Sequence, residues 1–348
     1  MARPDITVMG AGIFGLSIAW AATLRGAKVR VIEVRGIGAG SSGGPVGSLS
    51  PHVPEAWNAK KSFQLESLLM AERWWAAVAQ ASKLPTGYGR TGRLQPLADA
   101  RAVDIANARH QTAQTLWQAQ AIWHVIPTTN AEWQPQSPSG FMVQDTLTAR
   151  LNPVQALAAL AAAITANGGE VITGPAQPEG PTVWATGAAG LYDLSEALTQ
   201  PAGSGIKGQA LLLHHDARTQ PQLFTDGLHI VPHADGTVAI GSTSEAIWTD
   251  PQSTDHQLDA LHRKAIIACP ALANAPIIAR WAGLRPRAKS RAPMLGAWPD
   301  RPSHFIANGG FKIGFGMAPK VAETMADLVL DGHDTIPADF RVEASLKR

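Results

Sequence analysis

Three glycines near the start of the chain, Gly10, Gly12 and Gly15, have the spacing G-x-G-x-x-G. They follow an apolar stretch, 6–9, that reads as a short buried strand, and they precede a helix-like segment, 16–25. The first glycine permits a tight turn, the second lets a pyrophosphate approach the backbone, and the third lets helix and strand pack closely. The N-terminus of that helix would offer N–H groups and a partial positive charge to phosphates. This order of elements predicts a dinucleotide-binding βαβ unit.

An acid and two serines extend this prediction. Glu33 ends the second apolar strand, 28–32, where a carboxylate can accept hydrogen bonds from ribose hydroxyls. The glycine- and serine-rich stretch 36–47 follows, and we favour a phosphate-binding loop there over a flexible linker, with hydroxyls donating to phosphate oxygens. From this part of the chain we expect cofactor contacts at Gly10, Ala11, Gly12, Ile13, Phe14, Gly15, Glu33, Val34, Ser41 and Ser42.

A second glycine-rich loop, 308–316, lies between a predicted strand, 304–307, and a predicted helix, 318–330. Four glycines ahead of a helix let a ligand approach the backbone and present a positive dipole end to negative charge. An ordinary strand-to-helix connection needs fewer glycines. The predicted strand 182–188 ends in a small-residue turn that would resume the same sheet. These two segments add Thr186, Gly187, Gly309, Gly310, Phe311, Lys312, Ile313 and Gly314 to the expected cofactor contacts.

The remaining pattern alternates helices with short strands, and its second half is rich in strands. We predict an α/β fold in which a Rossmann-like domain (1–85, 145–204 and 295–348) is interleaved with an α+β substrate domain (86–144 and 205–294) on a mixed, largely antiparallel sheet. The predicted helices are 61–82, 104–122, 151–166 and 258–269, and the predicted strands include 90–97, 170–172, 209–214, 227–232 and 237–241.

The bulk composition sets limits on function. The chain has 348 residues and a formal net charge of +2, too small by itself to imply binding to nucleic acid or membranes. Its single cysteine, Cys269, excludes intrachain disulfides and cysteine clusters and suits a reducing compartment. The longest apolar run, 156–164, is too short for a bilayer, and no leader precedes the first strand. We therefore expect a cytoplasmic protein with no membrane span and no metal.

The separated motifs together resemble the D-amino-acid-oxidase-like family of FAD-dependent oxidoreductases, of the glycine oxidase and sarcosine oxidase type. Their order and spacing along the chain carry this resemblance more than any one motif except the first. The matching segments are 8–15, Glu33, 40–43, 183–187, 205–209, 281–286 (WAGLRP) and 308–319 (NGGFKIGFGMAP).

The resemblance implies a nucleotide domain of the glutathione-reductase type that holds FAD, and oxidation of a small amino acid or secondary amine with oxygen or another electron acceptor. The arginine of the G-x-R-P segment, Arg285, matches the residue that clamps the substrate carboxylate. His229, Lys312 and His52 are further candidates for the substrate pocket. No cysteine lies near 292–295 and no histidine matches a linkage site, so FAD should be held noncovalently.

Two alternatives stay open. The segment 47–51 also resembles the FAD module of the bifunctional tRNA wobble-uridine enzyme, which removes a carboxymethyl group, and the basic run 280–291 would then meet phosphates. We do not expect nucleic acid as a partner, because the net charge is small. The N-terminal glycines alone also suit an NAD-dependent dehydrogenase, although the second glycine loop argues against it. The exact amine, the electron acceptor and a possible homo-oligomeric state are left open.

Overall fold

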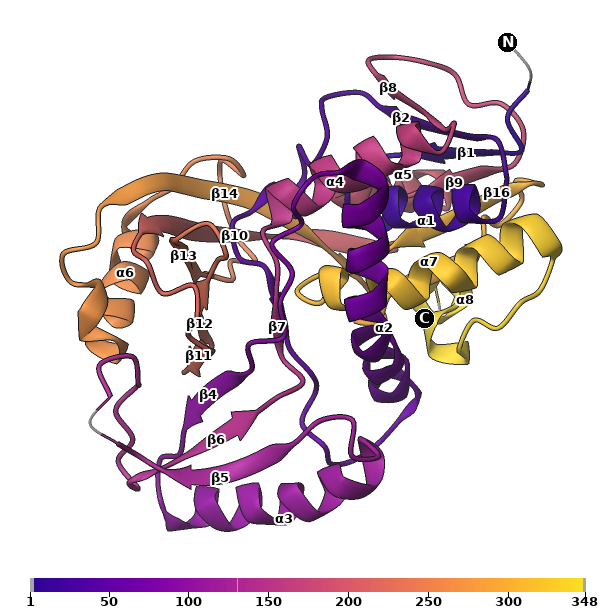
Figure 1. Ribbon diagram of the computed structural model, residues 1–348. Helices are drawn as coiled ribbons and strands as arrows, with labels where there is room; N and C mark the ends of the chain where they lie inside the picture. Colours follow the sequence, from indigo (N-terminus) through magenta and orange to yellow (C-terminus); the bar gives the residue numbers. More distant parts are fainter. Residues whose placement is uncertain (1–2, 130, 347–348) are drawn as a thin grey trace.

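The computed structural model describes residues 3–129 and 131–346, and it contains two large sheets (Figure 1). The first has six strands in the order β15-β16-β9-β1-β2-β8, all parallel except the β15–β16 pair. The predicted βαβ unit is present as β1, α1 and β2. The strands are β1 (Ile6–Met9), β2 (Val29–Glu33), β8 (Glu170–Thr173), β9 (Thr182–Trp184), β15 (Met294–Ala297) and β16 (His304–Asn308).

Helices cover this sheet and share one core with it. Helix α1 (Ile13–Leu24) contacts α4 (Pro153–Ala166) and α7 (Gly314–Asp331), and α2 (Ala59–Ser82) crosses both of these (Figure 1). Trp20 and Trp75 are almost fully buried in the core between these layers. Burial of such large apolar side chains fixes how the helices pack over the sheet.

The second sheet has eight strands in the order β14-β10-β13-β12-β11-β4-β6-β5, all antiparallel except the β11–β4 pair. Helix α3 (Ala100–Leu116) packs on β5, and α6 (His256–Ala268) packs on β10, β12 and β13. The predicted α/β fold with a mixed, largely antiparallel second sheet is confirmed. The strands are β4 (Arg93–Pro96), β5 (Trp123–Pro127), β6 (Phe141–Asp145), β10 (Gly203–His214), β11 (Gln222–Thr225), β12 (Leu228–Pro232), β13 (Thr237–Gly241) and β14 (Ile277–Ala288).

Smaller elements connect the two sheets. Helix α5 (Gly187–Ala197) leads from the first sheet into β10 of the second. The short strands β3 (Ser48–Leu49) and β7 (Ala149–Arg150) pair with each other in an antiparallel sheet of their own. Short helices η1 (Ser41–Gly43), η2 (Pro270–Leu272), η3 (Ala338–Phe340) and α8 (Val342–Leu346) complete the described elements. The domain boundaries given above stay a prediction.

Several predicted boundaries were wrong for identifiable reasons. The helix expected at 104–122 is α3, which starts at Ala100 because the Asp99 side chain accepts the N–H of Ala102 as a helix cap. Helix α7 starts at Gly314, so the predicted loop 308–316 already contains its first turn and Pro319 lies inside the helix. The predicted strand 182–188 ends at Trp184. Helix α5 and strand β14 were not predicted.

Candidate active site

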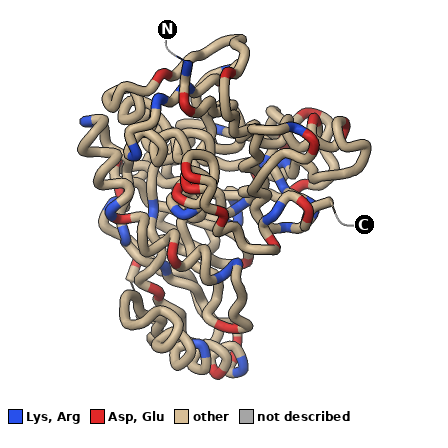
Figure 2. Tube along the Cα trace, turned by 90° about the vertical axis from the view of Figure 1, so that its right-hand side faces the viewer, with Lys and Arg blue, Asp and Glu red and all other residues tan. Residues whose placement is uncertain are grey.

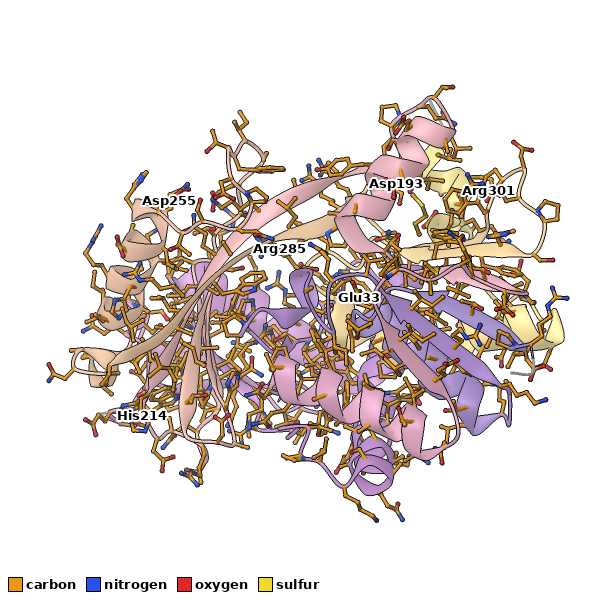
Figure 3. The ribbon with its side chains drawn as sticks, turned by 90° about the horizontal axis from the view of Figure 1, so that it is seen from above. Glu33, Asp193, His214, Asp255, Arg285 and Arg301 are labelled. Carbon is orange, nitrogen blue, oxygen red and sulfur yellow. The ribbon has the colours of Figure 1, made fainter. Side chains whose placement is uncertain are left out.

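One cavity of about 600 Å³ lies between the two sheets and collects most of the predicted site residues. Its walls come from the β1–α1 turn, the segment 40–52, the start of α5, strands β4, β12 and β14, and the loop into α7. Figure 3 shows Glu33 and Arg285 approaching this central region from the two halves of the molecule. All four candidate substrate residues, Arg285, His229, Lys312 and His52, line it.

The three N-terminal glycines have different tasks. Gly10 has φ +107°, and a Cβ there would lie 2.5 Å from the Ala185 carbonyl oxygen. A Cβ on Gly15 would lie 1.9 Å from the Gly10 carbonyl oxygen, so this glycine permits the close packing of α1 on β1. Gly12 lines the cavity, where an added Cβ would meet only Ser42 Oγ, at 3.2 Å. Gly10 and Gly15 therefore shape the turn, and Gly12 leaves the backbone bare toward the cavity.

Glu33 and Ser42 hold the turn in place. The Glu33 carboxylate accepts the backbone N–H of Ala11 and of Arg35, both at 3.0 Å. Ser42 Oγ accepts the Ile13 N–H at 3.0 Å, which leaves its own proton free to donate. The serine thus occupies one helix amide that we expected to be open to phosphate.

Three helices start at the cavity, and this convergence gives it a positive potential. The N-cap residues Gly12, Thr186 and Ile313 begin α1, α5 and α7, and none of them caps its helix through its own side chain. All three line the cavity. Each helix N-terminus carries about half a positive charge on its N–H groups. The cavity is therefore suited to a ligand with several negative groups along its length.

Most of the other predicted cofactor contacts also line the cavity, but three do not. Ala11 points its N–H at Glu33, Gly15 packs on Gly10, and Gly309 packs against Ala288 and Ala292. These three therefore support the loops, and nothing in the cavity wall comes from them. The predicted contacts that line it are Gly10, Gly12, Ile13, Phe14, Glu33, Val34, Ser41, Ser42, Thr186, Gly187, Gly310, Phe311, Lys312, Ile313 and Gly314.

Arg285 lies on β14, a buried strand position and not a basic loop, and it is 8% exposed. Its Nη1 donates to Ser242 Oγ and its Nη2 donates to the carbonyl oxygens of Lys207 and Thr243. An arginine has five N–H donors, so two remain, and the buried Nε has no partner. Burial lowers the pKa of Arg285 to about 10, which leaves it charged near neutral pH.

Burial disfavours the charged form of both candidate histidines. Burial, with the charges of Arg93 and Lys312, lowers the pKa of His229 to about 3, and its ring lies 4.6 Å from that of Phe224. Burial also lowers the pKa of His52, whose Nδ1 pairs with Gln64 Oε1. Because that oxygen only accepts, Nδ1 carries the proton and Nε2 is an acceptor.

Lys312 lies at the exposed rim of the cavity, with its Nζ 5.7 Å from the centre of the Phe311 ring. Partial burial and the charge of Arg285 lower its pKa. The Arg285 guanidinium carbon lies 5.8 Å from the same ring centre. Phe311 therefore separates two cations that face one part of the cavity.

Sequence reasoning missed Arg93, a cavity residue on β4 that is 6% exposed. Its Nε donates to Asp145 Oδ2 at 2.9 Å, and its guanidinium carbon lies 5.3 Å from the centre of the Phe224 ring. Arg93 and Asp145 face one another across the β4–β6 pair. No signal in the sequence reveals that pairing, because it depends on the register of two separated strands.

The basic run 280–291 does not form one surface. Arg280 is exposed and pairs with Asp259 on α6, whereas Arg285 points into the cavity. Arg287 lies over Phe311, 5.9 Å from its ring centre. Acidic and basic residues are interspersed along the trace in Figure 2. These positions give the phosphate-binding interpretation of the run no support.

The residues present fit FAD. Gly12, Gly40 and Gly314 line the cavity, and a Cβ at each would meet only one atom within 4 Å, so a ligand can approach the backbone there. Glu33 lies at the end of β2, where an adenosine ribose binds in such folds, and the helix N-termini suit a pyrophosphate.

A family model described as FAD dependent oxidoreductase (DAO) matches residues 5–328. The chain belongs to this family. The predicted resemblance is therefore confirmed, FAD is the cofactor of the family, and the protein is an enzyme.

Curated relatives carry related names. The bifunctional protein ThiO/ThiG of Trichormus variabilis is 27% identical over 94% of this chain and 53% of its own length. The chain thus spans about half the length of such relatives. Glycine oxidase of Pseudomonas aeruginosa is 32% identical over 39% of this chain and 38% of its own length.

Solved structures show the same fold. Glycine oxidase of Geobacillus kaustophilus has a TM-score of 0.84 at 19% identity, covering 98% of this chain and 99% of that one. L-proline dehydrogenase of P. horikoshii has a TM-score of 0.78 at 21% identity, covering 97% and 96%. At these identities the likeness concerns the fold alone.

None of the helices in 3–129 and 131–346 combines the length and hydropathy that a bilayer crossing requires. No group of three or more His, Cys, Asp or Glu side chains there is placed to hold a metal ion.

Proposed function

We propose that the protein oxidises the C–N bond of a small amino acid or secondary amine, with FAD held noncovalently. The observation that carries this proposal is Arg285, a buried charged arginine with an unpaired N–H donor on Nη1, in the same cavity as three helix N-termini and Gly12. A carboxylate is the group that such a guanidinium binds best. The names of the relatives, glycine oxidase among them, agree with this substrate class.

Orientation is the main contribution of the protein. Ser242 and the carbonyls of Lys207 and Thr243 fix the Arg285 guanidinium, so a bound carboxylate takes one position. FAD, when bound, supplies a two-electron acceptor that takes a hydride from the carbon next to the amine nitrogen. Holding that carbon in a fixed place contributes more than acid–base catalysis to such a step.

The cations also select the protonation state of the amine. Arg93, Arg285 and Lys312 line the substrate half, and they disfavour a positively charged ammonium. The amine therefore binds uncharged, with a lone pair that helps the hydride leave. His52 Nε2 and the neutral His229 are possible acceptors for the amine N–H groups. The oxidised product is an imine, which water hydrolyses to a carbonyl compound and ammonia or a primary amine.

The test is to add glycine, sarcosine, proline and D-amino acids to the protein without oxygen and to monitor reduction of the bound flavin by the loss of flavin absorbance. We expect at least one of them to bleach the flavin, and Arg285→Met to weaken its binding at least about tenfold, because a charge-assisted hydrogen bond is lost. Arg287→Met removes one charge beside the same Phe311 ring but outside the cavity, and serves as the control. A flavin that no amine in the panel reduces would refute the proposal.

A further inference from the structure

Arg93 is a buried cation whose binding face is unused. Only its Nε is engaged, by Asp145 Oδ2, while Nη1 and Nη2 donate no hydrogen bond to any residue in the described ranges. Both nitrogens also keep some exposed surface. In this they differ from Arg285 Nε, which is fully buried and has no partner. The residue is 6% exposed and lines the cavity. The open end of its planar fork therefore faces the ligand space.

The structure holds this fork rigidly. The Asp145 carboxylate is fully buried and its other oxygen accepts the Thr148 N–H at 2.7 Å. The Arg93 guanidinium also lies over the Phe224 ring, 5.3 Å from its centre. An arginine fixed at Nε and stacked on an aromatic ring presents Nη1 and Nη2 with little loss of side-chain entropy on binding.

Arg93 faces the same space as the predicted carboxylate anchor. Its charge and that of Lys312 both act on His229, which lies against Phe224. Lys312 in turn lies near Arg285, across Phe311. A continuous wall thus runs from Arg93 past the two aromatic rings to Arg285.

The charges along this wall are not balanced by the protein. Asp145 offsets Arg93, but neither Arg285 nor Lys312 forms an ion pair with a described residue. Glu245, which acts on Arg285, is already 3.9 Å from Lys207. The acids that line the cavity, Glu33 and Asp193, come from β2 and α5. A ligand with one carboxylate would leave the Arg93 fork without a partner.

We propose that Arg93 binds a second carboxylate, so that the preferred substrate is an amine carrying two acidic groups, one held at Arg285 and the other at Arg93. This rests on the proposed amine oxidation, and it narrows the substrate class from small amino acids to dicarboxylic amines. A secondary amine flanked by two carboxymethyl groups and an acidic amino acid both belong to this class. Arg93 acts as a specificity-determining residue, since the reacting carbon is positioned from Arg285.

The first measurement is binding of unreactive acids to the holoenzyme, by calorimetry and by the shift of the flavin absorbance. The probes are pairs of equal length: malonate and propionate, succinate and butyrate, glutarate and valerate. We expect one diacid to bind at least about tenfold more tightly than its monoacid, as a second charge-assisted contact gives. Equal affinities in all three pairs would overturn the proposal.

Variants separate the Arg93 contact from general attraction to positive charge. Arg93→Met is combined with Asp145→Asn, so that no buried carboxylate is left unpaired. We expect the diacid advantage to disappear there and to persist in Arg287→Met, which removes a charge outside the cavity. Arg93→Lys keeps the positive charge and the ion pair with Asp145 but lacks the two Nη groups of the guanidinium. It is used in place of the double variant if the double variant fails to retain flavin. A diacid advantage unchanged in these variants would refute the role of Arg93.

The second measurement is anaerobic flavin reduction by sarcosine and iminodiacetate, which differ only by one carboxylate. We expect iminodiacetate to be at least about tenfold more effective at low concentration. If sarcosine reduces the flavin and no diacid is preferred, the proposed function stands and the Arg93 site falls. If diacids bind through Arg93 but no amine reduces the flavin, the site stands and amine oxidation falls.

Discussion

Gly10 and Gly12 lie two residues apart, yet alanine at each position should damage the protein in a different way. Gly10 has φ +107°, a region that costs a residue with a side chain about 1–2 kcal/mol. Its Cβ would also lie 2.5 Å from the Ala185 carbonyl oxygen, and such overpacking costs about 1–3 kcal/mol. We expect Gly10→Ala to lower the free energy of unfolding by about 3 kcal/mol.

Gly12 has φ −85°, which any residue adopts, and its Cβ would meet only the Ser42 hydroxyl, at 3.2 Å. The stability of the apoprotein should therefore be almost unchanged in Gly12→Ala. The added methyl group would occupy the space where a pyrophosphate approaches the backbone. FAD affinity should fall at least about tenfold, or 1.4 kcal/mol.

The assay is thermal unfolding of the apoproteins together with FAD titration. An unfolding entropy of about 2.1 cal/mol/K per residue over 348 residues converts 3 kcal/mol into a drop in Tm of about 4 °C for Gly10→Ala. Gly12→Ala should keep the wild-type Tm without FAD and gain less from added FAD. A Gly12→Ala protein that binds FAD as tightly as wild type would refute this assignment of tasks.

Three further predictions follow from buried groups. Asp145→Ala should lower the free energy of unfolding by about 3–5 kcal/mol in denaturant titrations, because Arg93 would be left buried and unpaired. Arg218→Ala, which breaks an exposed ion pair with Asp216, is the control and should leave the midpoint of the denaturant transition unchanged. Burial lowers the pKa of His229 to about 3, whereas in the unfolded chain this histidine titrates near 6.5, so between these pH values only the unfolded chain binds the proton. The free energy of unfolding should therefore fall as the pH drops from 6.5 toward 4. In pH-dependent denaturant titrations, His229→Gln should remove up to about 1.4 kcal/mol per pH unit of that slope. Burial raises the pKa of Cys269 to about 11, so a thiol reagent at pH 8 should label the denatured protein and leave the native protein unlabelled over the same time.

The sequence was most informative where the constraint is local. The G-x-G-x-x-G turn and Glu33 at the end of β2 were predicted from the order of residues in one βαβ unit, and the structure contains both. The missing side chain of Gly15 leaves room for the Gly10 carbonyl oxygen, and the Glu33 carboxylate and the Ser42 hydroxyl accept N–H groups of the turn. Such features appear in a single sequence because few residue types satisfy them.

The sequence did not predict features that depend on how strands distant in the chain pair with one another. Arg93 and Asp145 are 52 residues apart and meet only through the register of β4 and β6. Arg285 was predicted as the substrate-binding arginine, but its place on β14, where it pairs with Ile206 on β10 and points into the cavity, was not predicted. Helix α5 escaped detection because Gly187, Ala188, Ala189 and Gly190 read as a turn. Strand register and tertiary packing are not encoded in local spacing.

The long antiparallel pair of β10 and β14 determines which positions in the cavity wall can be substituted without disturbing the cofactor half. The two strands pair from Gly203 and Ala288 to Leu213 and Ile277, with one shift of register between Leu212 and Leu213 (Figure 1). Strand β14 carries Arg285 and is followed by β15 in the other sheet. Pairing along both strands restricts bending, so the proposed carboxylate anchor, Arg285, keeps its distance from the helix N-termini. Arg93 lies on β4, which four other strands separate from β14 in the order of the same sheet. Redesign aimed at new substrates should therefore begin at β4 and its neighbour β11, where changes leave the cofactor half undisturbed.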